Sequence, residues 1–334
     1  MRGVQVLALV AVSACSADQH GECAGDLIAP ASTHECIVPN WYDRAFELDV
    51  PGSWDGHSPL PIVVLLHGGG GSRQTANRST CPKGNENSPE CFIPFAASRG
   101  YAVVIPDGTG QHPLRNIRTW NGGGGNDLQC TSGPACKSHV DDIRYFGDLL
   151  AQVRGTIPVD DKRIYVTGIS NGGAMSHRLA CELPDQVAAI VGVSGANEWA
   201  DDGGPCSTAV PVRQIHGTAD PCWSFTGGTS ACLQDDGRPK TSVMTTMEGW
   251  RTRNGCSAQP IETPRAERDP NDGTSLVITT WQGCTAATEL YAVQGGGHTW
   301  PSGNPYADES LIGVVSTEVD NADVFDFFDA HVHP

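Results

Sequence analysis

The chain has 334 residues, which is long for one domain by length alone but common for α/β folds. Its formal net charge of −17 argues against nucleic acid or an anionic membrane surface as a partner and fits an extracellular protein with a neutral substrate. The sequence contains no Pro/Ser/Thr-rich linker, internal repeat or low-complexity tract, so an attached binding module is not expected.

Residues 1–17 have the pattern of a secretory signal. A positive charge at Arg2 precedes the apolar stretch 4–12, which is too short to span a bilayer. The run Val12-Ser13-Ala14-Cys15 is similar to a bacterial lipobox, in which Cys15 becomes the lipidated first residue of the mature chain; cleavage a residue or two later is the alternative. We therefore expect an extracellular protein, secreted or held at the outer surface through a lipid on Cys15. Residues 18–44 are then an extended lead-in to a main domain over 45–334.

Strand and helix patterns alternate along the main domain. Apolar or β-branched runs predict strands at 44–50, 62–66, 101–105, 163–167, 187–193, 211–216, 276–281 and 289–293. Helical spacing predicts helices at 140–154, 174–183 and 318–331, and the last is expected to be a closing helix with an acidic face rather than a calcium site. This alternation predicts an α/β fold, with a doubly wound, mostly parallel sheet and helices on both faces.

Ser170 lies at a sharp, glycine-flanked turn between a predicted strand and a predicted helix. The sequence there is Gly168-Ile169-Ser170-Asn171-Gly172-Gly173. Glycines on both sides let the backbone bend tightly, and the following helix aims its N-terminal N–H groups at an anion formed beside the serine. The pattern predicts a nucleophilic serine.

An acid and a base follow in the order Ser, acid, His that this architecture demands. Asp220 lies just past the strand 211–216, and His298 follows the strand 289–293 and three glycines. All three residues then lie at the carboxyl ends of strands, where open α/β sheets bind ligands. A neutral imidazole takes the proton of the serine, and a carboxylate holds that imidazole in the right tautomer. The rival acids in nearby loops are Asp201, Asp202 and Asp235.

A second glycine-rich loop supplies the candidate oxyanion hole. The buried strand 62–66 is followed by His67-Gly68-Gly69-Gly70-Gly71. Backbone N–H groups of Gly68, Gly69 or Gly70 can approach a substrate oxygen closely, and the N–H of Asn171 is the expected second donor. His67 and His216, each at a strand end, are expected to be local hydrogen-bonding residues rather than bases.

Three tryptophans fall in loops near the predicted site. Trp120, Trp223 and Trp300 are candidates for stacking on an aromatic acyl group or a sugar, and the alternative for each is that it packs its own loop. Trp300 is close to His298 in the sequence and is the favoured pocket-lining residue. The acidic pair Asp141-Asp142 is expected to cap the helix at 140–154 rather than to do acid–base chemistry.

The cysteine content supports export. The chain has 13 cysteines, and setting Cys15 aside leaves an even number that is compatible with disulfides. The sequence has no Cys-x-x-Cys pair, so a zinc site is disfavoured and no metal is expected. A bridge beside Asp220 would fix the position of the acid. Pairing by proximity predicts Cys23–Cys36, Cys81–Cys91, Cys130–Cys136, Cys181–Cys206, Cys222–Cys232 and Cys256–Cys284.

Five motifs together resemble the secreted polyhydroxybutyrate depolymerase and feruloyl esterase family. They lie at 67–71, 141–142, 168–175, 216–221 and 296–301, and the similarity runs from about residue 45 to 330. The resemblance implies an α/β-hydrolase fold and a serine carboxylesterase without cofactor or metal, with Ser170, Asp220 and His298 as nucleophile, acid and base. It implies an ester substrate, either a polyester or a feruloylated or acylated plant polysaccharide. The lack of a linker and binding module departs from the polymer-degrading type.

Two other functions are weighed against this interpretation. One is a non-catalytic surface protein that binds polysaccharide on a hydrolase scaffold, and the presence of all three catalytic residue types disfavours it. The other is a peptidase of the same fold, which usually carries a gating domain for which this chain has no room. Oligomeric state and acyl specificity cannot be predicted from these motifs.

Overall fold

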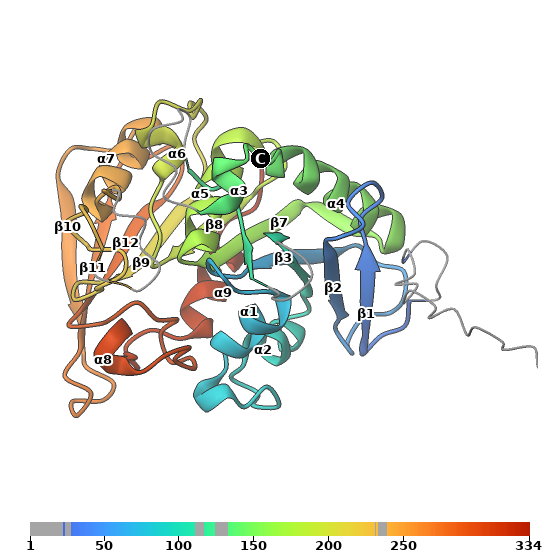
Figure 1. Cartoon of the computed structure of the whole chain (residues 1–334), viewed down its shortest axis with the longest axis horizontal. Coiled ribbons are helices and arrows are strands. Elements are labelled where there is room, and N and C mark those ends of the chain that lie inside the picture. Colours follow the sequence, from blue (N-terminus) through green and yellow to red (C-terminus); the bar gives the residue numbers. More distant parts are fainter. Residues whose placement is uncertain (1–22, 24–27, 111–116, 124–132, 231, 233–238) are drawn as a thin grey trace, which may run out of the picture.

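The computed structural model describes residues 23, 28–110, 117–123, 133–230, 232 and 239–334. The predicted signal segment, with Cys15, lies outside the described residues. A ten-stranded sheet forms the centre of the fold, in the order β1-β2-β4-β3-β7-β8-β9-β12-β11-β10 (Figure 1). Its strands are β1 (Ser32–Ile37), β2 (Ala45–Val50), β3 (Leu60–Leu66), β4 (Ala102–Pro106), β7 (Val159–Ile169), β8 (Ala189–Val193), β9 (Val212–Gly217), β10 (Pro260–Arg265), β11 (Ser275–Trp281) and β12 (Thr288–Gln294). A small separate ribbon is formed by β5 (Thr109–Gly110) and β6 (Arg118–Thr119).

The middle of the sheet is parallel and its two edges are antiparallel. Strands β4, β3, β7, β8, β9 and β12 pair in parallel. At the edges, β1 and β2 on one side and β11 and β10 on the other are antiparallel to their neighbours. The predicted doubly wound, mostly parallel sheet is confirmed. Strands β7, β8, β9 and β12 are consecutive and parallel in the sheet. The residues that follow β7, β9 and β12 therefore lie close together at the C-terminal ends of these strands.

The helices cover both faces of the sheet (Figure 1). They are α1 (Arg73–Ser79), α2 (Phe92–Ser98), α3 (Pro134–Lys137), α4 (Asp142–Thr156), α5 (Asn171–Glu182), α6 (Glu198–Asp201), α7 (Val243–Arg253), α8 (Glu309–Ile312) and α9 (Asn321–Asp329), with a 3₁₀ turn at Pro82–Gly84. As predicted, Asp141 caps α4 by accepting from the N–H of Arg144 at 3.0 Å. Among the described residues, no helix combines the length and apolarity needed to cross a bilayer.

Strand β3 shows how each face acquires its own apolar layer. All seven of its residues are buried. Ile62, Val64 and Leu66 belong to a cluster with residues of α4 and α5, whereas Val63 and Leu65 belong to a second cluster with residues of α1, α2 and α9. Successive side chains of a strand point to opposite faces, so this split identifies a sheet covered on both sides.

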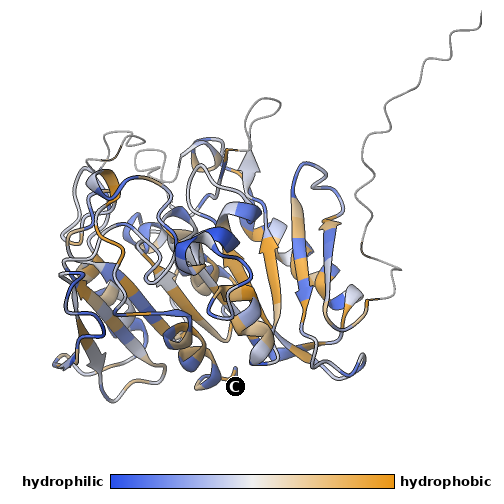
Figure 2. Ribbon diagram, turned by 90° about the horizontal axis from the view of Figure 1, so that it is seen from below, coloured by the Kyte–Doolittle hydropathy of each residue, from blue (hydrophilic) through white to orange (hydrophobic). Residues whose placement is uncertain are grey.

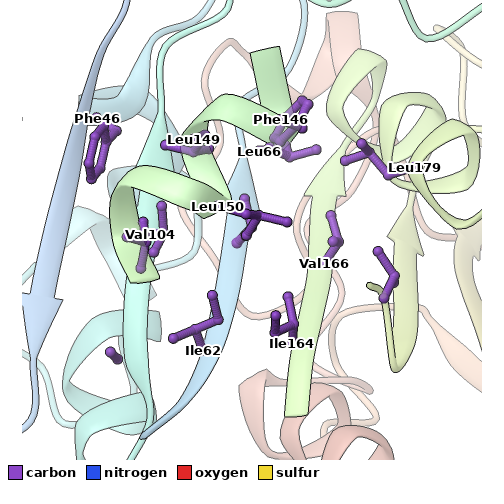
Figure 3. Close-up of a cluster of buried hydrophobic side chains, with 14 of the residues drawn as sticks. Phe46, Ile62, Leu66, Val104, Phe146, Leu149, Leu150, Ile164, Val166 and Leu179 are labelled. Carbon is purple, nitrogen blue, oxygen red and sulfur yellow. The ribbon is translucent and has the colours of Figure 1, made fainter. Parts of the chain in front are cut away.

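The layer beneath α4 is the core that supports the nucleophile strand. Figure 3 shows Leu149 and Leu150 of α4 among side chains that include Ile62 of β3 and Ile164 of β7, and all four are buried. Burying one such side chain contributes roughly 1.5–3 kcal/mol. Figure 2 shows the corresponding long hydrophobic stretches in the middle strands of the sheet. This packing fixes the ends of β3 and β7, from which the glycine-rich loop and Ser170 emerge.

Some elements were not expected from the sequence. Strand β1 lies inside the predicted lead-in 18–44 and pairs antiparallel with β2, so this segment is partly a sheet edge. Strand β10 contains two prolines and is mostly exposed, a combination that only an edge strand tolerates. The helices α2 and α7 were also missed. The helix predicted at 318–331 begins only at Asn321, where Asp320 caps α9.

Five predicted disulfides join the cysteines that proximity paired. They are Cys23–Cys36, Cys81–Cys91, Cys181–Cys206, Cys222–Cys232 and Cys256–Cys284. The sixth predicted pair, Cys130–Cys136, includes Cys130, which lies outside the described residues. Bridges in this number are typical of proteins in an oxidising compartment.

Candidate active site

Ser170 lies at the junction between β7 and α5 in a backbone conformation that is rare for a residue with a side chain. Its φ is +58° and its ψ −121°. Such a residue is strained, and the strain is held by two hydrogen bonds: its N–H donates to the oxygen of Val193 at 2.8 Å, and its carbonyl accepts from Ala174 at 2.9 Å. This is the strained strand-to-helix turn that the predicted elbow requires.

Gly172 explains why the elbow needs glycine. A Cβ at this position would lie 2.6 Å from the backbone oxygens of both Leu66 and His67, which is far inside van der Waals contact. The missing side chain lets the first turn of α5 pack directly on the end of β3. The nucleophile turn and the glycine-rich loop after β3 are therefore in backbone contact.

The glycine-rich loop lies beside the nucleophile turn. A Cβ on Gly68 would be 3.5 Å from Cβ of Ser170, and a Cβ on Gly69 would be 3.5 Å from Cβ of Asn171. The N–H of Gly70, however, donates to the oxygen of Arg118 at 2.8 Å, so Gly70 is not available as an oxyanion donor and that part of the prediction is wrong. The candidate donors are therefore Asn171, whose N–H begins a helix, and Gly68 or Gly69.

A buried histidine and a buried tryptophan make hydrogen bonds that fix this loop and the neighbouring nucleophile turn. Nδ1 of His67 lies 2.8 Å from the oxygen of Gly68, and its Nε2 accepts from the N–H of Gly108 at 2.9 Å. Burial lowers the pKa of His67 to about 4, so the ring is neutral near neutral pH. The backbone of Trp120 accepts from and donates to the side-chain amide of Asn171, at 3.0 and 2.7 Å. These contacts leave His67 as a local hydrogen-bonding residue, in agreement with its sequence interpretation.

Asp220 and His298 form the acid–base pair that the strand order predicts. Nδ1 of His298 lies 2.7 Å from Oδ2 of Asp220, and both side chains are buried. The other carboxylate oxygen accepts from the N–H groups of Cys222 at 2.8 Å and Trp223 at 2.7 Å. Because the carboxylate accepts at Nδ1, the lone pair of the imidazole is left on Nε2, where a base needs it.

The charge on Asp220 is favoured by these contacts. Burial alone would raise the pKa of Asp220, but the His298 ring and the hydrogen bonds from His216 and His298 outweigh it, and the pKa lies well below its usual range. The carboxylate is therefore ionised at any pH at which the protein would act.

The loops of Ser170 and His298 meet across the end of β8. The N–H of Ser170 bonds to Val193 of β8, and the hydroxyl of the next residue, Ser194, donates to the oxygen of Thr299 at 3.4 Å. Within the described residues, no hydrogen bond joins the Ser170 hydroxyl directly to His298. In enzymes without bound substrate this contact is often long and tightens in the Michaelis complex.

The three candidate tryptophans are buried. Trp120 is 0% exposed and Trp223 and Trp300 are each 2% exposed. Each indole N–H has a partner within the protein, namely the oxygen of His67 at 3.0 Å, the oxygen of Thr241 at 3.2 Å and Oδ1 of Asn321 at 2.9 Å, in that order. The expectation that these rings are exposed for stacking is wrong, because each ring is buried and bonds to a distant segment of the chain rather than to its own loop.

The structure instead brings Tyr306 to the base. Its side chain is 60% exposed, its ring meets the ring of His298 edge-to-face at 6.3 Å, and its hydroxyl lies 3.7 Å from Sγ of Cys222. The sequence analysis missed this residue because it lies in a loop eight positions beyond His298 with no motif around it. A Tyr–Ala step between a Pro and an Asp carries no signal of its own.

Two further points concern the rival acids and metal binding. Asp201 accepts from the hydroxyl of Thr241 at 2.6 Å, and Asp235 lies outside the described residues. Asp220, Cys222 and His298 bring metal-ligand atom types within 4.8 Å of one another. The sulfur of Cys222 is in a disulfide, however, and the other two groups bond to each other. This donor set does not fit a metal ion.

Comparison with known proteins places the chain in a large family. A family model described as the alpha/beta hydrolase fold matches residues 61–291, which include Ser170 and Asp220. Feruloyl esterase B of Piromyces equi is 27% identical over 257 residues, or 74% of this chain and 41% of that protein, so the chain spans less than half of the relative's length. Feruloyl esterase D of Neurospora crassa is 25% identical over 261 residues, or 78% of this chain and 75% of that protein.

A solved structure supports the same fold. The acetyl xylan esterase of Aspergillus awamori superposes with a TM-score of 0.56 at 15% identity, and covers 89% of this chain and 99% of its own. The family model runs from the start of β3 into β12, so it includes the strands that carry the elbow, the glycine-rich loop and the candidate acid. The chain belongs to the alpha/beta hydrolase fold family.

Proposed function

We propose that the chain is a serine carboxylesterase in which Ser170, His298 and Asp220 act as nucleophile, base and acid. The observation that carries the proposal is the 2.7 Å contact between Nδ1 of His298 and the ionised carboxylate of Asp220. It leaves Nε2 of His298 as the acceptor for a serine proton, at the C-terminal ends of the parallel strands, where Ser170 is held in a strained, partly exposed turn.

The reaction follows from these positions. Oγ of Ser170 attacks the ester carbonyl while its proton passes to Nε2 of His298. The N–H groups of Asn171 and of Gly68 or Gly69 stabilise the negative oxygen of the tetrahedral intermediate, and each such donor is worth about 100- to 1000-fold in rate. The alcohol leaves with the proton from Nε2. Water then attacks the acyl-serine while its proton passes to Nε2. The second tetrahedral intermediate collapses, Nε2 returns this proton to Oγ of Ser170, and the acid is released.

We further propose that the substrate is a feruloyl ester or a related acyl ester of plant polysaccharide. The relatives named above are feruloyl esterases. Tyr306 supports an aromatic acyl group, because it offers an exposed ring beside the base on which such a group can stack. Polyhydroxybutyrate is the alternative ester that the sequence motifs imply, and a substrate panel separates the two.

Export of the protein is part of the proposal. The five disulfides among the described residues support an oxidising, extracellular location. Lipidation of Cys15 stays a prediction, which mass spectrometry of the mature N-terminus tests.

The first test is Ser170→Ala. Loss of the nucleophile is expected to lower kcat for p-nitrophenyl butyrate by about a millionfold while the thermal unfolding curve is retained. A fluorophosphonate probe is expected to label the wild-type protein stoichiometrically and the variant not at all. Ser98→Ala, at the end of α2, is the matched control and should keep both rate and labelling. A Ser170→Ala variant with wild-type turnover would refute the assignment.

The second test is a substrate panel. Rates are compared for methyl ferulate, acetylated xylan, p-nitrophenyl butyrate and amorphous polyhydroxybutyrate, with aryl amides as the peptidase control. The proposal expects the highest kcat/KM on methyl ferulate and no turnover of amides. Preferential release of hydroxybutyrate would move the assignment to a polyester hydrolase.

A further inference from the structure

A second imidazole reaches the carboxylate of the candidate acid. Nε2 of His216, in β9, lies 3.3 Å from Oδ2 of Asp220, the same oxygen that accepts from Nδ1 of His298 at 2.7 Å. The side chains of His216 and Asp220 are both fully buried. The ester mechanism above has no step for His216.

The neighbours of His216 fix its proton on Nε2. That nitrogen lies 2.7 Å from the backbone oxygen of Trp223, and a carbonyl only accepts, so Nε2 carries hydrogen. Nδ1 lies 3.1 Å from Nε2 of Gln214. The same amide nitrogen lies 2.7 Å from the oxygen of Gly195, which fixes the orientation of the amide. Gln214 is therefore the donor to Nδ1, and both ring nitrogens of His216 have assigned roles.

Gln214 is in turn oriented by a chain of hydrogen bonds that involves two other buried side chains. Nε1 of Trp250, in α7, donates to Nδ1 of His177, in α5, at 3.0 Å. An indole N–H only donates, so His177 carries its own proton on Nε2, which donates to Oε1 of Gln214 at 2.8 Å. Burial lowers the pKa of His177 to about 4, which keeps the ring neutral near neutral pH. The donors run in one direction, from Trp250 through His177 and Gln214 to His216.

We propose that His216 is a positioning residue for the candidate acid, held by this chain of donors so that its Nε2–H, which bonds to the oxygen of Trp223 and lies beside Oδ2 of Asp220, orients the carboxylate and weakens its interaction with protonated His298. The inference rests on the proposed esterase function and adds a role for buried polar groups that the reaction itself does not use. The positive end of the His216 Nε2–H dipole lies near Oδ2 of Asp220, so it disfavours a second positive charge there. Without it, protonated His298 becomes more stable and a higher pH is needed to free the base.

Few charged groups face these two rings in the described part of the chain. Asp220 contacts both imidazoles, and Tyr306 faces His298. The ring of Phe225 closes another side of His216, with centroids 6.0 Å apart. The remaining groups act from further off: His177 behind Gln214, Arg253 of α7 on His177, and Lys240 over the ring of Trp223. A change at His216 therefore reaches His298 through Asp220.

Two substitutions separate positioning from space filling. In His216→Gln, the amide nitrogen takes the place of Nε2 and can still donate to Asp220 and Trp223. In His216→Asn, the shorter amide takes the place of Nδ1, so it accepts from Gln214 but does not reach Asp220. The pair thus keeps a buried amide in both variants and differs in the hydrogen bond to the acid. Both are compared with wild type by thermal unfolding and by the pH profile of kcat and kcat/KM for an aryl ester.

The proposal expects different outcomes for the two variants. His216→Asn should move the acidic limb of the profile to higher pH by about half a unit and lower the kcat plateau by about tenfold, because a hydrogen bond to a charged group is lost. His216→Gln should restore the wild-type limb and most of kcat. Equal damage in both variants, an unchanged profile in His216→Asn, or a shift of its limb to lower pH would each overturn the proposal.

A measurement on the wild-type protein keeps the inference testable if a variant fails to fold. Histidine-selective ¹⁵N labelling and long-range ¹H–¹⁵N correlation report which ring nitrogen carries the proton near neutral pH. The expected result is a proton on Nε2 and a bare Nδ1 for both His216 and His177. A proton on Nδ1 of His216, or on both of its nitrogens, would contradict the donor chain. This readout needs no activity, so it is distinct from failure of the esterase assignment, which the fluorophosphonate probe reports.

Discussion

The two sides of the candidate site are held in place by different means. On the nucleophile side, the backbone of the turn at Ser170 is in direct contact with the backbone of the loop at Gly68. The buried rings of His67 and Trp120 pack next to this contact. On the acid–base side, Asp220 and His298 lie on loops after β9 and β12, and side-chain hydrogen bonds and a disulfide hold them.

This difference determines how each side is expected to fail. Backbone contact between Gly172 and the end of β3 leaves no room for an added methyl group, so substitutions at this position act through sterics and stability. The acid–base side depends on the charge and direction of a few side-chain hydrogen bonds, so isosteric substitutions of Asp220 or His298 act on rate with less effect on folding.

Asp220→Asn should have the largest effect on rate. The amide is close in shape to the carboxylate, but its nitrogen would donate to Nδ1 of His298 and force the ring into the tautomer that cannot act as base. The expected loss in kcat is about 10⁴-fold. Thermal unfolding serves as the control, because the backbone donors of Cys222 and Trp223 can still bond to the amide oxygen. A folded variant with more than a tenth of wild-type kcat would contradict the assignment of Asp220 as the residue that fixes the tautomer of His298.

Gly172→Ala should have the largest effect on stability. Its Cβ would lie 2.6 Å from two backbone oxygens that cannot move without displacing β3, so we expect the free energy of unfolding to fall by about 3 kcal/mol or more. Gly68→Ala is the matched control, since its Cβ meets its neighbours at 3.5 Å. It should fold almost normally and show its effect in kcat, because the methyl group lies beside Ser170. Denaturant unfolding of both variants checks this, and equal stabilities would contradict the steric account.

The sequence predicted the parts of the fold and site that depend on local pattern. The strand before Ser170, the order of Ser170, Asp220 and His298, and the glycine-rich loop follow from periodicity and turn chemistry, and the structure brings their loops to one edge of the sheet. Disulfide pairing by proximity also agreed for the five described bridges. In each case the residues in contact are close together in the sequence, or the order of the parallel strands determines which loops meet.

The parts that were missed depend on contacts between distant segments. The use of the Gly70 N–H by Arg118, the burial of Trp120 and the position of Tyr306 beside His298 are decided by how loops cross one another. The donor chain behind Asp220 likewise joins α7, α5 and β9. A buried glutamine in an apolar strand, Gln214, was the one sequence signal of it, because a buried amide needs partners.

Removing the Cys222–Cys232 bridge should affect both stability and rate. The bridge joins two cysteines that are 10 positions apart in the sequence, next to Asp220, and the paired Cys→Ser change should lower the free energy of unfolding by about 2.5 kcal/mol. Freeing this loop should also lower kcat about threefold, since Cys222 supplies one of the backbone donors to Asp220. The control is the Cys256–Cys284 pair, which closes a longer loop at the opposite end of β12. Its removal should cost at least as much stability with no change in kcat, and equal kinetic effects would argue against a local role for the first bridge.

Tyr306→Ala should have the smallest effect and should depend on the substrate. Tyr306 is exposed, and no hydrogen bond joins it to His298 among the described residues, so folding and the kcat for acetyl esters should be nearly unchanged. For methyl ferulate, loss of an aromatic pair worth about 1 kcal/mol should raise KM about fivefold. Tyr306→Phe keeps the ring and should keep the KM of wild type, which separates stacking from any role of the hydroxyl near Cys222. If the two variants raise KM equally on both kinds of ester, the ring does not select aromatic acyl groups, and the acid–base side contributes orientation of the base but no specificity.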